Sequence, residues 1–338
     1  MLEKPDFPDE SISACLQAEY GLRVAQIAFL PLGADLNTAV YRVTIDNGTL
    51  YFLKLRSGVF DENSVALPKF LSDQGITHII APLATSTGQL WANLGTCQAI
   101  LYPFIEGRNS YEIDLSDRHW IELGAVLKRL HSLALPPALS SCLLHETYSP
   151  KWRESVKTFM ARIADDSFDN PIAANTALFL KAKRAAVLDL VERTERCAQA
   201  LQAYSPEFVL CHSDLHAGNI LIADDGAFYL VDWDNPLLAP KERDLMYTGG
   251  GQFGATRTPA EEERLFYLGY GQTPIDQIAL AYYRYERIVE DIAAYCEQIF
   301  STNDGGADRP QALHYLRSNF EPNGTIEIAY QADKTFRS

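Results

Sequence analysis

Three polar residues stand at the ends of short apolar runs and could do chemistry together. The stretch VLCHSDLHAGNILI, residues 209–222, places Asp214 and Asn219 five positions apart, and FYLVDWDNP places Asp232 after the β-prone run 228–231. A carboxylate can orient an attacking hydroxyl and accept its proton, and carboxylate and amide oxygens suit Mg²⁺. Two strands joined by ADDGA would bring Asp232 back beside Asn219. The pattern therefore predicts a catalytic aspartate together with a magnesium site.

The D-x-x-x-x-N spacing is that of a kinase catalytic loop, in which the aspartate orients the acceptor hydroxyl and the asparagine binds a metal ion. The bare spacing is common by chance, but the order strand, H-S-D, N, strand, turn, strand, D-W-D is far more specific. Trp233-Asp234 stands where the kinase motif has Phe-Gly. The competing interpretation is that Asp214 and Asn219 only cap a turn.

Two histidines in the same stretch offer a rival metal site. His212 and His216 lie four positions apart, which on a helix would place both side chains on one zinc-binding face. Gly218 and the flanking strands favour a loop instead, and no third ligand follows at a zinc-like spacing. We therefore predict that His212 supports the loop by hydrogen bonding to its backbone.

The composition limits the classes of protein to consider. The chain has 338 residues, 47% of them hydrophobic, and a formal net charge of −15. A duplex-binding protein usually carries a basic patch, so no nucleic-acid partner is expected. The acidic balance fits either a solvated surface or the attraction of a cationic small molecule. The start MLEKPDFPDESI has no signal-peptide pattern, no apolar run is long enough for a membrane span, and six scattered cysteines are typical of a reducing cytoplasm.

The N-terminal part of the chain has the pattern of a sheet. Residues 24–56 are rich in β-prone residues, and Asp46-Asn47-Gly48 is a strong hairpin signal that leaves Lys54 at the end of the second strand. Residues 61–74 have helical spacing, with Pro68 inside the segment. Two more strand-like runs follow, IIAPLA and CQAILYPFIEG.

After Gly107 helical periodicity takes over. Ser116 is a predicted N-cap, and long helical segments follow at 178–203 and 276–300. The layout predicts an α+β protein with a small β-rich N-terminal lobe, residues 1–101, and a larger, mostly helical lobe, residues 107–338. Residues 102–106 form the predicted connector.

The combined motif CHSDLHAGNILI…YLVDWDNPLLAPKERDL resembles the aminoglycoside phosphotransferase family, relatives of the protein kinases. Three further segments resemble its spectinomycin phosphotransferase branch: YSPKWRE at 148–154, APKERDLMYTGGG at 239–251 and RIVEDIA at 287–293. The resemblance covers essentially the whole chain. It implies a two-lobed, protein-kinase-like fold and phosphoryl transfer from ATP or GTP with Mg²⁺.

The resemblance also implies roles for matching positions. Asp214 matches the catalytic aspartate, and Asn219 and Asp232 match the metal ligands. Lys54 in YFLKL matches the lysine that holds the α- and β-phosphates; a solvated strand-end lysine is the alternative. Asp244 in KERDL matches an aspartate that braces the catalytic loop.

Other nucleotide contacts are less specific in the sequence. Glu62 is the candidate ion-pair partner of Lys54, although it could equally be a favourable charge at a helix start. Gly33, in LPLGADLNTAVYRV, lies where a kinase has its phosphate loop. The segment ILYPFIEG resembles the hinge that binds adenine through its backbone, and a plain edge strand would look the same. The candidate hinge residues are Tyr102, Pro103, Phe104 and Ile105.

The acceptor is expected to be a small cationic molecule, and no membrane or protein partner is implied. Candidate substrate residues lie on the predicted long helix and near YSPKWRE: Glu286, Glu290, Asp291 and Trp152. The alternative is a solvated charged face on which Arg284 and Arg287 balance Glu286 and Glu290. Three functions stay open: a kinase of spectinomycin or another aminocyclitol, a metabolic kinase acting on choline or homoserine, and a nucleotide-binding pseudokinase. The intact set of Lys54, Asp214, Asn219 and Asp232 argues against the third.

Overall fold

The computed structural model describes residues 4–5, 7–32, 37–204, 206–253, 256–301 and 308–337, without the side chains of 334–337. The chain forms two compact units. The first unit comprises Met1–Ile113, Leu135–Cys142 and Gly218–Pro236, and the second comprises Asp114–Ala134, Leu143–Ala217 and Leu237–Ser338. An antiparallel sheet in the first unit and a helical second unit confirm the predicted α+β class. Within the described ranges, no helix has the length and apolar character that crossing a membrane requires.

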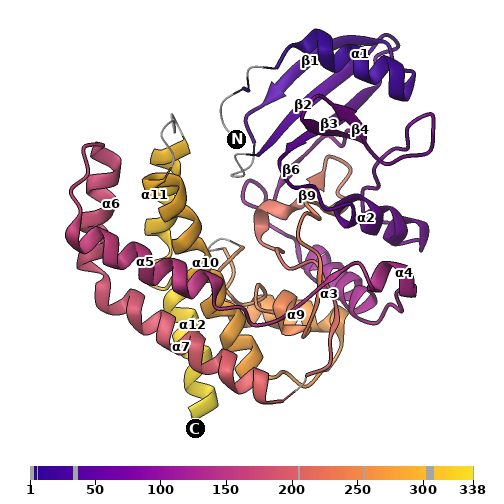
Figure 1. Cartoon of the computed structure of the whole chain (residues 1–338). Coiled ribbons are helices and arrows are strands. Elements are labelled where there is room, and N and C mark those ends of the chain that lie inside the picture. Colours follow the sequence, from indigo (N-terminus) through magenta and orange to yellow (C-terminus); the bar gives the residue numbers. More distant parts are fainter. Residues whose placement is uncertain are drawn as a thin grey trace. The chain divides into compact units, whose positions relative to one another are not determined.

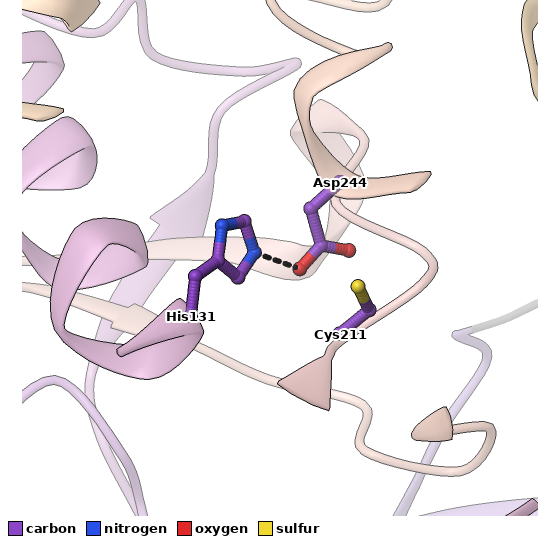
Figure 2. Close-up of side chains that lie close together, drawn as sticks. All are labelled: His131, Cys211 and Asp244. Atoms are coloured by element: carbon purple, nitrogen blue, oxygen red, sulfur yellow. Dashed lines mark hydrogen bonds and ion pairs between the residues drawn. The ribbon is translucent and has the colours of Figure 1, made fainter. Parts of the chain in front are cut away.

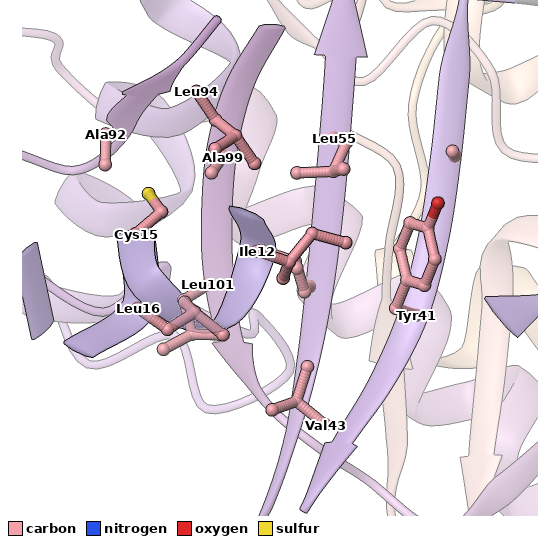
Figure 3. Packing of buried hydrophobic residues seen from close by; sticks show 12 residues of the cluster. Ile12, Cys15, Leu16, Tyr41, Val43, Leu55, Ala92, Leu94, Ala99 and Leu101 are labelled. Carbon is pink, nitrogen blue, oxygen red and sulfur yellow. The ribbon is translucent and has the colours of Figure 1, made fainter. Parts of the chain in front are cut away.

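The first unit is built on a five-stranded antiparallel sheet (Figure 1). Its strand order is β1-β2-β3-β5-β4: β1 Val24–Leu30, β2 Thr38–Ile45, β3 Leu50–Ser57, β5 Cys97–Pro103 and β4 Ala92–Leu94. The predicted hairpin is confirmed as β2 and β3, with Gly48 at φ 84 in the turn. Helix α1, Asp9–Tyr20, packs Ile12 and Leu16 against sheet residues that include Tyr41 and Leu101 (Figure 3).

Alternation along β3 explains why a lysine can face away from this core. Leu53 and Leu55 are buried in the cluster against α1, and successive strand side chains point to opposite faces of a sheet. Lys54 and Arg56 therefore share the other face. Lys54 is nevertheless 9% exposed as a residue, so its charge must find partners inside the unit.

The remaining elements of the first unit are short. They are α2 Asn63–Asp73, α4 Pro137–Ser140, and a three-stranded sheet ordered β10 Phe228–Leu230, β9 Ile220–Ala223 and β6 Gly107–Asn109. The predicted helix over 61–74 is confirmed, and Pro68 lies inside it. The run IIAPLA does not form a strand; it contributes an isolated bridge between Ile79 and Leu230.

The second unit gathers helices around α10, Gln277–Phe300, which packs against α5, α7, α11 and α12 (Figure 1). Ser116 and Asp276 cap α3 and α10 with their side chains, so both predicted helix starts are confirmed. The other elements are α3 Asp117–His131, β7 Leu144–His145, α5 Lys151–Asp165, α6 Pro171–Ala182, α7 Arg184–Ala203, β8 Val209–Cys211, β11 Leu237–Ala239, α8 Glu242–Leu245, α9 Pro259–Tyr270, α11 Asp308–Ser318 and α12 Thr325–Arg337.

The prediction of one helix over 178–203 is wrong. The chain leaves helical geometry at Lys183, with φ −95 and ψ 7, and α6 and α7 are separate helices. The sequence holds no glycine or proline at this point. We attribute the break to packing, because α7 packs mainly on α10 whereas α6 contacts both α10 and α11.

Helices α3 and α9 approach closely because glycines face each other's backbone. A Cβ added at Gly124 would lie 2.1 Å from the carbonyl oxygen of Phe266, and one at Gly269 would lie 1.7 Å from that of Ile121. Neither distance is compatible with a side chain. The crossing fixes both His131 and Tyr270, which lie at the last positions of α3 and α9.

We predict that Gly269→Ala lowers the free energy of unfolding by about 1–3 kcal/mol, as overpacking does. An unconstrained helix position would instead gain about 0.5–1 kcal/mol from the same change. Urea unfolding of the purified protein measures the difference. Leu268→Ala is the control, because Leu268 is 63% exposed on the same helix. A Gly269→Ala variant at least as stable as the parent would contradict the close crossing.

Candidate active site

In the first unit, Lys54 joins two carboxylates of the D-W-D segment. Its Nζ lies 3.0 Å from Asp232 Oδ1 and 2.7 Å from Asp234 Oδ1. Arg56, on the same face of β3, pairs with the other oxygen of Asp234. Burial opposes the charge of Lys54, but the two aspartates outweigh it and raise the lysine pKa. The unit therefore presents a fixed cation beside oxygen ligands.

In the structure, Lys54 pairs with Asp232 and Asp234 and not with the predicted partner Glu62. Glu62 is an exposed residue at the N-cap of α2, and the carboxylates at Lys54 come from Asp232 and Asp234. Asp234 stood out in the sequence only as a departure from the kinase motif. The signal for Arg56 was its spacing of two from Lys54, which puts both on one face of a strand.

Asp232 sits in a strained backbone position. Its φ is 65, in the left-handed region that costs a non-glycine residue about 1–3 kcal/mol. The strand β10 ends at Leu230, two residues earlier than Asp232, and the buried Trp233 anchors the turn by donating from Nε1 to the Leu230 carbonyl. The Asp232 side chain is 48% exposed while its Oδ1 pairs with Lys54.

Asn219 lies next to this segment within the first unit. Val231 N donates to the carbonyl oxygen of Asn219 at 3.0 Å, which holds the two predicted metal-binding segments together. Asn219 is 6% exposed and precedes β9 in a 3-10 turn, Ala217–Asn219. A carboxylate and an amide oxygen form the kind of donor set that Mg²⁺ takes from proteins.

The predicted hinge residues lie at and just after the end of β5, a strand between β3 and β4 in the first unit's sheet. Tyr102 and Pro103 are the last residues of β5, where they pair with Phe52 and Tyr51 of β3. Phe104 N donates to the Leu50 carbonyl at 3.3 Å. Ile105 follows before β6 and is partly buried. Gly33 lies outside the described residues, and the predicted lobe boundaries at 101 and 107 stay a prediction.

In the second unit, a buried carboxylate holds the loop that leads to Asp214. Asp244 Oδ1 accepts from Ser213 N at 2.7 Å, and Asp244 Oδ2 accepts from His212 N at 3.0 Å. His131 Nε2 lies 3.1 Å from Oδ2 (Figure 2). Ser213 has φ 77, and this turn lets two successive N–H groups reach one carboxylate. Burial opposes the charge of Asp244, yet the hydrogen bond and charge of His131 lower its pKa.

The same carboxylate belongs to a buried group of potential metal ligands. Ligand atoms of His131, Cys211 and Asp244 lie within 4.8 Å of one another (Figure 2). Each is engaged by protein: His131 Nδ1 lies 2.8 Å from Tyr270 OH, and Cys211 Sγ lies 3.6 Å from the Pro240 carbonyl. Burial raises the pKa of the Cys211 thiol well above its usual value, which disfavours the thiolate that a metal needs. The group supports the loop.

Asp214 itself is surrounded by donors. Arg287 Nη1 pairs with Asp214 Oδ1, and Tyr247 OH lies 3.1 Å from the same oxygen. His216 Nε2 lies 3.6 Å from Oδ2. Burial would raise the pKa of Asp214, but Arg287, His216 and His212 outweigh it and hold the pKa well below its usual range. Asp214 is therefore ionised at neutral pH.

The histidines of the loop contact groups of the loop itself. His212 Nδ1 accepts from Asp214 N at 3.3 Å, which is a contact to the loop backbone. His216 pairs with Asp214, and neither histidine belongs to a cluster of three close ligand atoms among the described residues.

The acids predicted to bind substrate on α10 all have protein partners. Glu286 is buried, and its Oε2 lies 2.8 Å from Arg153 Nη1 of α5. Burial raises the pKa of Glu286 to about 7, although Arg153 opposes the rise. The solvated-face alternative is therefore wrong for Glu286, and the structure places its carboxylate in the helix packing.

The other three candidates lie nearer the surface of the unit. Asp291 Oδ1 is 3.0 Å from Arg287 Nε, and Glu290 Oε2 is 3.9 Å from Arg243 Nη2. Trp152 is partly buried, with Lys151 Nζ 4.0 Å from its ring centroid. Of the four predicted residues, Asp291 is the one linked to Asp214, through the shared Arg287. Arg287 had appeared in the sequence only as a balancing charge.

Comparison with known proteins relates this chain to phosphotransferases. A model described as the phosphotransferase enzyme family matches residues 28–279. The crystal structure of spectinomycin phosphotransferase, APH(9)-Ia, with ADP and spectinomycin is 36% identical to this chain, with a TM-score of 0.89 over 98% of this chain and 100% of that one. Its AMP-bound complex is 35% identical, with a TM-score of 0.84 over 95% and 98%. Choline kinase LicA from Streptococcus pneumoniae, at 15% identity and a TM-score of 0.57 over 92% and 99%, shares the fold.

We predict that Asp244→Asn lowers the free energy of unfolding by about 2–4 kcal/mol at neutral pH, because an amide NH₂ would face the donors that now share a carboxylate. The lowered pKa of Asp244 makes its contribution present above the unfolded pKa of about 3.9 and lost as pH falls through the folded pKa. The difference in the free energy of unfolding between parent and variant should therefore become smaller in acid.

Urea unfolding at several pH values measures this gap. Asp225→Asn, at an exposed turn position, is the control. A pH-independent gap, or none, would show that the Asp244 carboxylate is not the group that holds the loop.

Proposed function

Because the chain belongs to the phosphotransferase enzyme family and is a small-molecule kinase, we propose that it transfers the γ-phosphoryl group of ATP or GTP to a hydroxyl of a cationic aminocyclitol, with spectinomycin as the first candidate. The observation that carries the proposal is the similarity to a spectinomycin-bound phosphotransferase over 98% of the chain. The motifs around Asp214 and Asp232 support the same chemistry from within the sequence.

The nucleotide is assigned to the first unit. Lys54 is a buried cation whose partners are two carboxylates, and phosphate oxygens can take their place. Asn219 and Asp232 are the proposed ligands of Mg²⁺, which neutralises phosphate charge when bound. Asp234, held by Lys54 and Arg56, keeps the lysine in place.

The acceptor is assigned to Asp214 in the second unit. In a loose transition state the acceptor proton leaves late, so a weak base that orients the hydroxyl is sufficient. Asp214 has that character, because Arg287 and the loop histidines keep it ionised. Its main task in this account is alignment of the hydroxyl, with proton acceptance as the later step.

Charge and shape support a compact cationic acceptor. The net charge of −15 attracts cations at a distance. Spectinomycin is a rigid fused-ring molecule with two amines, so it loses little conformational freedom on binding. A longer, flexible aminoglycoside would place its hydroxyls differently, and an error of about 1 Å can cost about 10²-fold in rate.

We predict that Asp232→Asn weakens nucleotide binding in the presence of Mg²⁺ and has little effect without it. The reason is that the change removes the charge of a proposed metal ligand and keeps the volume of the side chain. Titration calorimetry with ADP, with and without Mg²⁺, gives both affinities. Asp225→Asn, exposed on the β9–β10 turn, is the matched control. An unchanged effect of Mg²⁺ would remove Asp232 from the metal site.

We also predict that spectinomycin is phosphorylated with a higher kcat/KM than kanamycin, and that added salt lowers kcat/KM for spectinomycin because exposed charges are screened beyond about 8–10 Å. A coupled ADP-release assay at two salt concentrations measures this. Asp214→Asn is the control for enzymatic transfer, with a loss of about 10²–10⁴-fold in kcat.

Kanamycin equal to or better than spectinomycin would overturn the substrate and leave the kinase in place. Reaction with choline or homoserine alone would establish the metabolic alternative. Nucleotide binding without transfer to any acceptor would mark a pseudokinase.

A further inference from the structure

Helix α10 brings an arginine to the proposed catalytic aspartate from far along the chain. Arg287 Nη1 pairs with Asp214 Oδ1 and lies 3.3 Å from Tyr247 OH. The Arg287 side chain is 20% exposed. Its Nε lies 3.0 Å from Asp291 Oδ1, one turn further along the helix. The guanidinium is thus held by one carboxylate of its own helix while it contacts Asp214.

Tyr247 adds a second contact to the same oxygen. Its buried hydroxyl lies 3.1 Å from Asp214 Oδ1 and 3.0 Å from the Ser213 carbonyl. Arg284, one turn before Arg287 on α10, donates to the carbonyls of Met246 and Thr248, the neighbours of Tyr247. Arg287 therefore contacts the side chain of Asp214, and Arg284 holds the backbone on either side of Tyr247.

We propose that Arg287 is a positioning residue for phosphoryl transfer, which fixes the orientation of the Asp214 carboxylate. The inference rests on the proposed function, because it takes Asp214 as the group that aligns the acceptor hydroxyl. A carboxylate with one oxygen held from two directions has little rotational freedom, and alignment of reacting groups is a large part of catalysis in this type of reaction. Asp291 supports the arrangement by orienting Arg287.

The contact between Arg287 and Asp214 also affects the pKa of Asp214. Arg287 and Tyr247 face Asp214 from α10 and the segment after α8, and His212 and His216 face it from its own loop. Asp291 faces the far side of Arg287. Without the guanidinium, burial would raise the Asp214 pKa, because the charged form would lose its strongest opposite charge. A protonated Asp214 could orient the hydroxyl but could not take its proton.

The test compares Arg287→Met with a matched arginine. Arg193 on α7 is 21% exposed and also joins two carboxylates, Asp189 and Asp333, away from the proposed site. Arg287→Met should lower kcat about 10- to 100-fold without changing the KM for the nucleotide. It should also raise the pH at which kcat falls in acid, because Asp214 loses its strongest opposite charge. Arg193→Met should change stability alone. Arg287→Lys keeps the charge, so it should keep the acidic limb of the parent's kcat–pH profile. It should retain only part of the parent's kcat.

Several results would overturn the inference. If Arg287→Met had the same kcat and pH profile as Arg193→Met, Arg287 would have only a structural role. A raised kcat would show that Arg287 obstructs Asp214. If Arg287→Met does not fold, Arg287→Met/Asp291→Asn removes the guanidinium together with its opposing charge and takes the same measurements.

The inference can fail separately from the proposed function. Activity lost in Asp214→Asn and kept in Arg287→Met would leave the kinase intact and remove the role of Arg287. If the parent protein phosphorylates no acceptor, ¹³C NMR titration of aspartate carboxyls, with Asp214 assigned by its absence in Asp214→Asn, still reports on the contact. An Asp214 pKa equal in parent and Arg287→Met would contradict it.

Discussion

Asp244 carries a charge in the interior of the second unit, and the geometry of the loop before Asp214 depends on how that charge is compensated. The side chain is fully buried, so it must be hydrogen-bonded to be tolerated. Its donors are His131 and two successive backbone N–H groups, those of His212 and Ser213. These two can converge only because Ser213 takes a left-handed conformation. Hydrogen bonds to Asp244 thus offset the cost of burying its charge and of straining the Ser213 backbone, immediately before the proposed catalytic residue.

The supports of this carboxylate extend to the helix packing. His131 reaches Asp244 from the end of α3, and Tyr270, at the end of α9, contacts the other side of the imidazole. The close approach of α3 and α9, which requires Gly124 and Gly269, sets the positions of His131 and Tyr270. Helix α10 supplies Arg287 to Asp214. Buried ionic contacts of this kind are weak sources of stability, and we attribute them to the fixing of one geometry.

Local patterns in the sequence were sufficient for several elements and for the family. The turn at 46–48, the cap at Ser116 and the periodicity of 276–300 each depend on neighbouring residues, and each is confirmed. The break at Lys183 and the burial of Glu286 depend on packing between distant helices, which periodicity does not contain. The partner of Lys54 was missed for the same reason, since Asp234 is 180 residues away in the chain. Arg287 and Asp214 are likewise 73 residues apart.

Native-state hydrogen exchange at the amides of His212 and Ser213 shows whether Asp244 holds the loop before Asp214. Amides that open only with a large part of the structure exchange with the free energy of global unfolding, whereas those of mobile loops exchange near zero cost. If Asp244 holds the loop, both amides are protected as strongly as those of the buried strand β8. Exchange of either amide at the rate of an exposed loop would contradict it.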